Sequence, residues 1–465
     1  RYAYSPLAVA PSSIASPIWK FNPIKPIGMP QFWIRKTVND FANCAVMARE
    51  AGFDGVEIMG SEGYLLNEFL VTHTNKRKDK YGGDYENRMR FPLEVLEATR
   101  KAVGKDFIIM YRVSMLDLVP NGSTKEEIHT FAERVARGGA DIINTGIGWH
   151  EARVPTIATS VPRAAFTWVT RDTRKYLRSK GLDIPLVTTN RINTPDVAEK
   201  IIADGDADLV SMARPLLADP DFVKKAEEGR GKEINVCIGC NQACLDHTFT
   251  MRMSSCLVNP AACHETTHKL TPAKKPMHYV CVGAGPAGVS FAITMAQRGH
   301  RVTLFDKSDR VGGQFNIAKR IPGKDEFESS IVYWETMLEK YQDRITVKLN
   351  TEFSINSLRE FGEIPDGVVL ACGACPKPAN DKVMNGIRGN AHVVNYLDVI
   401  LGRKPVGDKV IVVGAGGIGF DVAEFLVADA ATDMPAFSKE WGIDMERKTG
   451  GGLAAPVTPP AKRKV

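Results

Sequence analysis

Short apolar runs alternate with amphipathic helical stretches between about residues 35 and 235, and this alternation constrains the fold most. The apolar runs are rich in Val and Ile, and they predict strands at 55–59, 107–112, 141–145, 185–189 and 207–212. Helical periodicity lies between them, at 38–51, 85–103, 125–138 and 196–204. Strands that are each followed by a helix are typical of a parallel sheet with both faces covered. The pattern therefore predicts an α/β fold.

These repeated units contain no Gly-rich nucleotide loop, which favours a (β/α)8 TIM barrel over a Rossmann sheet. Five strands cannot close a barrel that needs eight, and an open parallel sheet would leave an unpaired edge. We therefore expect residues 1–235 to be the C-terminal portion of an incomplete TIM barrel. Three units would be missing before Arg1, and the chain would be a fragment cut at both ends.

A Gly-rich loop follows the polar linker 271–276 and predicts a Rossmann-like FAD-binding domain over residues 277–400. Its first glycine permits a tight turn, its second lets a pyrophosphate approach the backbone, and its third lets helix pack on strand. An acid about twenty residues later is placed to bind a ribose hydroxyl. The alternative is an ordinary Gly-rich turn. The candidate FAD-binding residues are Gly283, Gly285, Ala287, Gly288, Asp306, Gly313 and Gln314.

A second such loop, with Gly414, Gly416 and Gly419, predicts the start of an NAD(P)-binding domain over residues 401–465. It has a predicted strand and helix, but the sequence shows no acidic residue or Arg at the position that would bind the ribose. Beyond about Asp429 the sequence is rich in Gly and Pro and loses its periodicity, so we expect a truncated loop there. The second strand of this domain is expected past Val465, which leaves the choice between NADPH and NADH open.

Four cysteines lie between the barrel-like region and the first Gly-rich loop: Cys237, Cys240, Cys244 and Cys256. Zinc ribbons usually have two C-x2-C pairs, and only the first pair here has that spacing. Three close cysteines with a remote fourth match iron–sulfur ligation better, although four buried structural thiols are an alternative. We therefore expect a [4Fe–4S] segment at 236–270. Cys372 and Cys375 also form C-x-x-C, but they end a predicted strand, and we interpret them as unrelated small residues.

Polar residues gather after the ends of the predicted barrel strands. In a TIM barrel these ends form the active-site mouth, and phosphate commonly binds after the last two strands. Those strands precede Arg191 and Arg214, which is consistent with FMN. The candidate mouth residues are Glu62, Tyr64, Arg112, His150, Asn190, Arg191, Ala213 and Arg214.

Composition excludes some classes of protein. The net charge of +6 comes without the basic runs of a nucleic-acid-binding protein, although it would help to attract an anionic substrate. The sequence has no stretch of 18 apolar residues and no visible signal peptide. We expect a soluble, cytoplasmic protein with no membrane span, and the oligomeric state stays open.

Several motifs resemble the Old Yellow Enzyme family of flavin barrels: GFDGVEI at 52–58, GYLLNEFL at 63–70 and YGGDYENRMRF at 81–91. The cysteines and the appended dinucleotide loops resemble its branch of 2,4-dienoyl-CoA reductases and trimethylamine dehydrogenases. IMGSEGY at 58–64, NTGIGWHEAR at 144–153 and CIGCNQACL at 237–245 resemble the bacterial NADPH-dependent 2,4-dienoyl-CoA reductases in particular. The likeness extends to about residue 445.

The resemblance implies an electron relay from NADPH through FAD and a [4Fe–4S] cluster to FMN, which reduces a dienoyl-CoA in β-oxidation of unsaturated fatty acids. It implies that Tyr64 donates a proton, that His150 tunes or shares this role, and that Glu62 plays a lesser part. Arg112 would stabilise reduced FMN, and Asn190, Arg191, Ala213 and Arg214 would hold it. Arg153 could meet a CoA phosphate, although plain solvent exposure is the alternative.

One departure from the family is informative. Many Old Yellow Enzymes have His and Asn where this chain has Met59 and Glu62, and Met cannot donate a hydrogen bond to a substrate carbonyl. The alternatives are another enoate or ene-reductase, an amine dehydrogenase, or an inactive redox fragment. An amine dehydrogenase would need an aromatic cage, and residues 64–150 show no convincing one.

Overall fold

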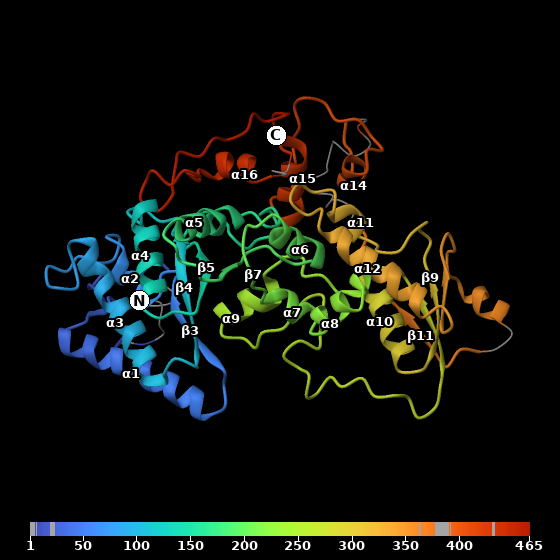
Figure 1. Ribbon diagram of the computed structural model, residues 1–465. Coiled ribbons are helices and arrows are strands. Elements are labelled where there is room, and N and C mark those ends of the chain that lie inside the picture. The colour runs from blue at the N-terminus through green and yellow to red at the C-terminus, as the bar shows by residue number, and fades with distance from the viewer. Residues whose placement is uncertain are drawn as a thin grey trace. The chain divides into compact units, whose positions relative to one another are not determined.

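The computed structural model describes residues 5, 7–18, 24–361, 364–376, 390, 392–429 and 433–465 (Figure 1). Its chain divides into two compact units. The first unit comprises Arg1–Met212 and Ala431–Thr458, and the second comprises Ala213–Ala430 and Pro459–Val465. Among the described helices, none combines the length and apolar character needed to cross a membrane.

A five-stranded parallel sheet forms the first unit, and its strands pair in chain order. Each predicted strand is present, and Met59, Arg112 and Asn144 lie side by side in the register of the first three strands. The strands are β3 (Gly55–Gly60), β4 (Ile108–Leu116), β5 (Ile142–Ile147), β6 (Leu186–Thr188) and β7 (Leu209–Val210). A separate short parallel pair is formed by β1 (Val9–Ala10) and β2 (Ile27–Gly28).

Helices lie between the strands of this sheet, and one precedes the first strand. The periodicity predicted four of them: α1 (Gln31–Glu50), α3 (Tyr85–Val103), α4 (Lys125–Arg137) and α6 (Pro195–Ala203). It did not predict α2 (Leu65–Leu70) and α5 (Thr167–Ser179). Local sequence determines where some of them begin. Thr124 and Glu127 form a reciprocal capping box at α4, and Thr194 caps α6 just before Pro195.

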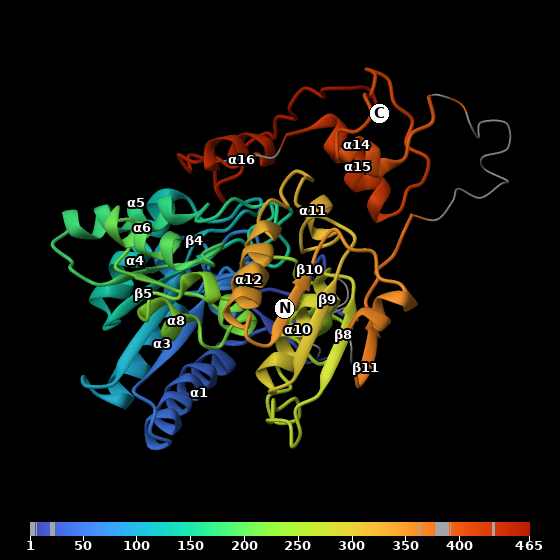
Figure 2. The ribbon, with the colours of Figure 1, turned by 90° about the vertical axis from the view of Figure 1, so that its right-hand side faces the viewer.

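The second unit contains a four-stranded parallel sheet in the order β10-β9-β8-β11 (Figure 2). Its strands are β8 (His278–Val282), β9 (Arg301–Phe305), β10 (Ile345–Lys348) and β11 (Gly367–Leu370). The first strand along the chain is therefore central, with the second and third on one side and the fourth on the other. This is the order of a Rossmann sheet, in which the first Gly-rich turn leaves the central strand.

The helices of the second unit are mostly short. They are α7 (Arg214–Ala218), α8 (Phe222–Glu227), α9 (His247–Phe249), α10 (Pro286–Gln297), α11 (Phe315–Ala318), α12 (Phe327–Lys340), α14 (Tyr396–Ile400) and α15 (Gly417–Val427). Short helices of other types lie at Gly231–Glu233, Gln242–Asp246 and Ile355–Phe361. The two longest described helices, α10 and α12, pack on each other, and α10 packs on β8, β9 and β10.

The segment after Asp429 differs from its prediction as a truncated loop. It contains a helix, α16 (Met434–Trp441), which Asp433 caps at its start and Gly442 ends with a φ of 68°. Phe437 is fully buried in the core of the first unit, where its ring meets Phe166 edge-on. The prediction had grouped this segment with the NAD(P)-binding domain. Buried apolar contacts place it instead with the barrel strands.

The last residues contact the segment before the second Gly-rich loop. Lys464 forms an isolated parallel bridge with Lys409, and Val410 N–H donates to the Lys464 carbonyl at 2.9 Å. No strand is assigned to the described residues just before Gly414, where the sequence predicted one. The position of the second strand of this domain stays a prediction.

Candidate active site and cofactor-binding loops

An acid–arginine pair lies at the carboxyl end of the first two barrel strands. Glu62 follows β3 and Arg112 lies within β4, and Arg112 Nη2 is 3.0 Å from Glu62 Oε1. Ser61 Oγ donates a very short hydrogen bond to the other carboxylate oxygen. Glu62 has a φ of 53°, a backbone conformation that non-glycine residues adopt at a cost and that is common at functional sites.

Tyr64 and His150 meet beside this pair. Their rings are arranged edge to face, with centroids 5.0 Å apart, and both side chains are exposed. The backbone ties the two strand ends together, since His150 N–H donates to the Glu62 carbonyl at 3.3 Å. Glu62, Tyr64, Arg112 and His150, which the sequence placed after three different strands, therefore form one cluster.

The environment shifts the pKa of three members of this cluster. Burial raises the pKa of Glu62, and the charges of Arg112 and Ser61's hydrogen bond only partly oppose it. Burial also lowers the pKa of His150, although part of its ring reaches solvent. At neutral pH these shifts favour a neutral imidazole, and they bring the proton affinities of the two groups toward each other.

Tyr64 differs from what the sequence suggested. A neighbour was expected to make its phenol more acidic, but burial first, and then the negative charge of Glu62, raise its pKa above 10. His150 cannot supply the opposing charge, because its own lowered pKa keeps it neutral. The phenol therefore keeps its proton firmly in the absence of substrate.

The structure supports a flavin at this mouth through an unpaired atom. Arg112 Nε is buried, and among the described residues it has no hydrogen-bond partner. A buried donor without an acceptor is costly, and a flavin ring oxygen is an acceptor of the required kind. Arg112 thus fits its predicted role beside FMN.

The predicted phosphate residues lie in different places. Asn190 and Arg191 both have positive φ, and Arg191 is buried with Nε donating to the Val161 carbonyl at 2.8 Å. Arg153 is exposed, as the plain alternative predicted. Ala213 and Arg214 belong to the second unit, where Arg214 begins α7.

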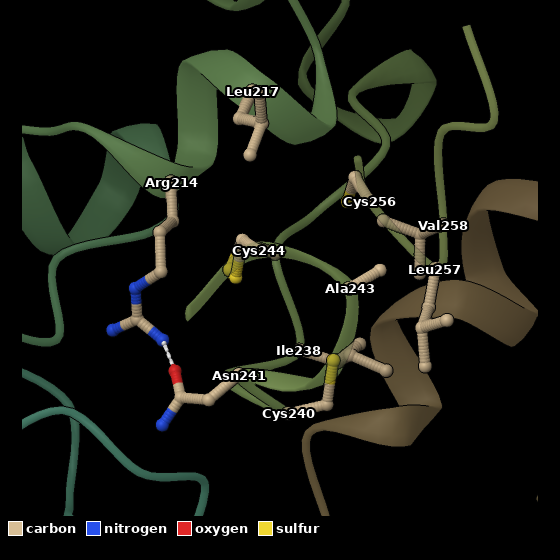
Figure 3. A pocket seen from close by; sticks show the side chains of 11 residues that line it. Arg214, Leu217, Ile238, Cys240, Asn241, Ala243, Cys244, Cys256, Leu257 and Val258 are labelled. Atoms are coloured by element: carbon tan, nitrogen blue, oxygen red, sulfur yellow. Dashed lines mark hydrogen bonds between the residues drawn. The ribbon is translucent and has the colours of Figure 1, made fainter. Parts of the chain in front are cut away.

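Arg214 lines a pocket that all four clustered cysteines share (Figure 3). Its guanidinium donates to Asn241 Oδ1, and Asn241 itself has a φ of 59°. About 310 Å³ inside this pocket is free of protein atoms, part of it open to solvent. The sequence assigned Arg214 to FMN and did not foresee its place beside the cysteines.

All four cysteines have free thiols, and burial raises the pKa of Cys240 and Cys256, with neighbouring cysteines adding to the effect. Within the described residues, no three His, Cys, Asp or Glu side chains are close enough to hold a single metal ion. The donor set nevertheless fits a polynuclear iron–sulfur cluster, in which each thiolate binds a different iron and the sulfurs stand further apart. The cluster remains a prediction.

The two Gly-rich loops have the same internal geometry. A Cβ on Gly288 would lie 1.8 Å from the Gly283 carbonyl oxygen, and a Cβ on Gly419 would lie 1.9 Å from that of Gly414. Gly283 and Gly414 both have positive φ, at 109° and 122°. Each loop therefore requires glycine at its first and third positions, as a dinucleotide-binding turn does.

The first loop is completed by residues from elsewhere in its unit. Asp306 Oδ2 accepts a 2.7 Å hydrogen bond from Ala284 N–H, so this acid supports the loop. Its contact with a ribose stays a prediction. Gly313 approaches Gly285 so closely that its Cβ would lie 3.0 Å from the Gly285 Cα. Gln314 Nε2 donates to the Ala374 carbonyl at 2.8 Å. Because Gly285 and Gly313 have no side chains, the space beside them stays open for a dinucleotide.

Comparison with known proteins agrees with this division of the chain. Residues 11–233 match the NADH:flavin oxidoreductase / NADH oxidase family, and residues 277–434 match the pyridine nucleotide-disulphide oxidoreductases. The chain joins an Old Yellow Enzyme-type flavin oxidoreductase region to a pyridine nucleotide-disulphide oxidoreductase region. The predicted α/β fold, a flavin barrel followed by dinucleotide-binding units, is confirmed.

Individual relatives extend over almost the whole chain. It is 40% identical to a metal reductase from Desulforamulus reducens, over 93% of this chain and 63% of that protein. It is 36% identical to an NADH oxidase from Thermoanaerobacter brockii, over 89% and 63%. A solved complex of 2-naphthoyl-CoA reductase with 2-naphthoyl-CoA has 33% identity and a TM-score of 0.85, over 90% and 62%. The chain spans less than two thirds of each of these proteins.

The sequence reasoning missed several residues that support the site. Asp117 and Trp149 hold the loop that carries His150, and the buried Arg447 forms an ion pair with the partly exposed Asp172. Asp433, Pro435 and Gly442 carry the start and stop signals of a helix, and they could have identified α16. The ion pair joins residues 275 positions apart, and no local pattern could have indicated it.

Proposed function

We propose that the protein containing this chain is an NAD(P)H-dependent flavin reductase that reduces a conjugated double bond in an acyl-CoA thioester. A 2,4-dienoyl-CoA is the proposed substrate, and degradation of unsaturated fatty acids is the proposed setting. The observation that carries this proposal is the cluster of Tyr64, His150, Glu62 and Arg112 at one strand edge. The likeness to 2-naphthoyl-CoA reductase supports a CoA thioester.

Four groups of residues would hold the cofactors. Arg112, Asn190 and Arg191 would hold FMN, and the four cysteines, beside Arg214, would hold a [4Fe–4S] cluster. The first Gly-rich loop would hold FAD and the second NADPH. When bound, these groups would supply electrons one or two at a time and deliver hydride to the conjugated substrate.

The chain's own residues would handle the proton that must follow the hydride. Tyr64 retains its proton because its pKa is raised, so its hydroxyl can donate to the dienolate formed from the substrate. A developing negative charge on the substrate is then the driving force, rather than prior acidification of the phenol. His150, neutral and in ring contact, would share the proton, and Glu62 would return one from solvent.

The mouth also offers donors for the thioester oxygen. Met59 has no donor, and Glu62 is an acceptor whenever it is ionised. Tyr64 and His150 are the exposed donors beside them. Orientation of the thioester by this pair would distinguish the site from that of enzymes with a His and Asn pair.

Stopped-flow spectroscopy of the full-length protein tests the proposal. Reduction by NADPH or NADH should bleach the flavins, and a 2,4-dienoyl-CoA should then reoxidise them within a turnover. The matched control is the corresponding free dienoic acid, which lacks CoA. Reoxidation by simple enones alone would indicate an ene-reductase, and flavin reduction by secondary or tertiary amines would indicate an amine dehydrogenase. Either outcome would exclude the dienoyl-CoA assignment.

Two variants separate the parts of this proposal. Tyr64→Phe should slow reoxidation by the dienoyl-CoA, or change which double-bond isomer is released, while flavin reduction by NADPH proceeds normally. Cys240→Ala should lower the iron content and the paramagnetic signal of the reduced protein while FMN stays bound. Full iron content in Cys240→Ala would exclude the cysteine pocket as the cluster site.

A further inference from the structure

The loop that carries His150 depends on a second loop for its position. Trp149 N–H and Nε1 both donate to Asp117, at 2.9 Å to the carbonyl oxygen and 2.9 Å to Oδ1. Gly148 N–H donates to the Leu116 carbonyl at 2.7 Å. Trp149 and Asp117 are both buried. Three hydrogen bonds therefore fix the backbone just before His150 to the end of β4.

Asp117 is in turn fully engaged within its own loop. Its Oδ1 also accepts from Ser114 Oγ at 2.6 Å, and its Oδ2 accepts from Ser123 N–H at 2.7 Å. The register of β4 against β5 shifts between Ser114 and Leu116, so this loop begins at an irregularity. A loop of this kind needs support from outside the sheet.

That support comes from residues 444–453, which belong to the segment after Asp429 that packs on the first unit. Gly451 forms hydrogen bonds in both directions, receiving one from Leu118 N–H at 2.8 Å and donating one to the Ser123 carbonyl at 2.9 Å. Arg447 is 2% exposed, pairs with Asp172 and donates to the Met115 carbonyl at 3.3 Å. The segment thus contacts both ends of the loop that follows β4, residues 117–123, which we call the β4 loop.

We propose that segment 444–453 is a positioning element for the reaction at the barrel mouth. It holds the β4 loop, whose Asp117 holds Trp149 and thereby sets the place of His150 against Tyr64. This inference rests on the proposed roles of Tyr64 and His150. It assigns a function to a stretch that lies more than 290 residues beyond them in the chain.

Gly451 is the position where the segment can be displaced most selectively. It has a φ of 85°, and a Cβ there would lie 1.9 Å from the Val119 carbonyl oxygen, so Gly451→Ala must push the segment off the loop. Gly52 offers the matched control, because it has a φ of 89° and nothing within 4 Å of the added Cβ. Both substitutions impose the same backbone strain, but only one disturbs the contact.

The first test compares the two half-reactions in full-length protein. Gly451→Ala should lower the limiting rate of reoxidation by a dienoyl-CoA about tenfold to a hundredfold, as expected for a displaced proton donor. The rate of flavin reduction and the KM for NADPH should stay unchanged, and Gly52→Ala should behave as wild type in both half-reactions. Equal rates in the two glycine variants would overturn the proposal while leaving the proposed function intact.

A double-mutant cycle tests whether the effect runs through His150. If it does, Gly451→Ala should slow His150→Ala no further, because the group being positioned is already absent. Additive losses would exclude this route. A normal rate in His150→Ala would remove His150 from the proposed mechanism, and the positioning inference would fall with it.

A further readout needs no substrate. Carbethoxylation of His150 by diethyl pyrocarbonate, followed by mass spectrometry, should change several-fold in Gly451→Ala, while the exposed His268 reacts as before. If Gly451→Ala does not fold, Arg447→Met and Arg447→Lys replace it. Lysine keeps the charge beside Asp172, so Arg447→Lys should recover part of the reoxidation rate that Arg447→Met loses. Unaltered labelling and reoxidation in Arg447→Met would contradict the proposal.

Discussion

The first unit contains two acid–arginine pairs whose carboxyl groups behave in opposite ways. Glu62 pairs with Arg112 at the strand edge, and Asp172 pairs with Arg447 beneath residues 444–453. Burial would raise the pKa of either acid. For Asp172, the nearby side chains of His129, Arg447 and Lys125 outweigh burial, and its pKa falls far below the usual value. For Glu62 burial wins, and its pKa rises.

The difference comes from the number of donors around each carboxylate. Asp172 has three cationic or potentially cationic neighbours, namely Arg447, Lys125 and His129. Glu62 has Arg112 and Ser61, but the negative charge of Glu57 opposes its ionisation. One pair is therefore permanently charged and suited to holding structure. The other has a raised pKa, holds its proton more tightly than an ordinary carboxyl group and is suited to chemistry.

The largest expected effect is on stability, from Asp172→Asn. It removes the counter-charge of the buried Arg447 guanidinium, although the amide oxygen can still accept a hydrogen bond, and this should lower the free energy of unfolding by about 3 kcal/mol, the low end for a broken buried pair. Asp172 is partly exposed, which limits the loss. Urea unfolding followed by circular dichroism measures it.

The exposed pair Lys36–Asp40 gives the control, with side chains 70% and 51% exposed. Asp40→Asn should change stability by about 0.5 kcal/mol or less. Equal losses in the two variants would mean that Asp172 and Arg447 do not form a structural pair.

The next effect is the pH dependence of that stability. Because the folded protein lowers the pKa of Asp172, its contribution is complete above the unfolded pKa of about 4 and is lost as the pH falls below it. The stability difference between wild type and Asp172→Asn should therefore be constant from pH 7 to 5 and shrink toward pH 3. A difference that stays constant from pH 5 down to pH 2 would contradict the lowered pKa.

Glu62→Gln should show the opposite slope with a smaller amplitude, about 1 kcal/mol or less, because glutamine can still accept from Arg112. The folded protein raises the pKa of Glu62, so its contribution is complete below about pH 4 and is lost as the pH rises through the folded value. As the pH rises through that value, wild type should lose stability relative to Glu62→Gln. The same urea unfolding series measures this difference at each pH. If the Glu62→Gln and Asp172→Asn differences changed with pH in the same direction, the two acids would not differ as described.

The smallest effect is expected from Glu57→Gln. This change removes the negative charge that helps to raise the pKa of Glu62, while its oxygen can still accept the 2.7 Å hydrogen bond from Asn144 Nδ2. The pKa of Glu62 should fall, which infrared difference spectra against Glu62→Gln would detect. An unchanged carboxyl titration would leave burial as the sole cause of the shift.

Features written in short stretches of sequence were predictable. The spacing of Gly283, Gly285 and Gly288 after a strand indicated a dinucleotide-binding turn, and the structure gives that turn the required close approach. The strand ends placed Glu62, Tyr64, Arg112 and His150 together, because parallel strands share one edge. Each of these inferences needed only neighbours in the chain or the rule of parallel pairing.

Properties that depend on distant neighbours were not predictable. The raised pKa of Tyr64 was not expected, because it depends on burial and on the charge of Glu62. The place of Arg214 beside the cysteines was not expected either, because its guanidinium meets Asn241 only in the folded chain. Residues 433–458 were read as a loop, because their burial depends on a surface formed by the first unit.

The amino-acid order thus sufficed for the α/β class, the two Gly-rich turns, the cysteine spacing and the strand-edge cluster. These depend on backbone conformation and periodicity, which act over a few residues. The folded arrangement decided which acid has a raised and which a lowered pKa, which residues surround Arg112 and Arg214, and which part of the chain contacts the loop before His150. Those outcomes depend on desolvation and charge, and both are set by groups that only folding brings within a few ångströms.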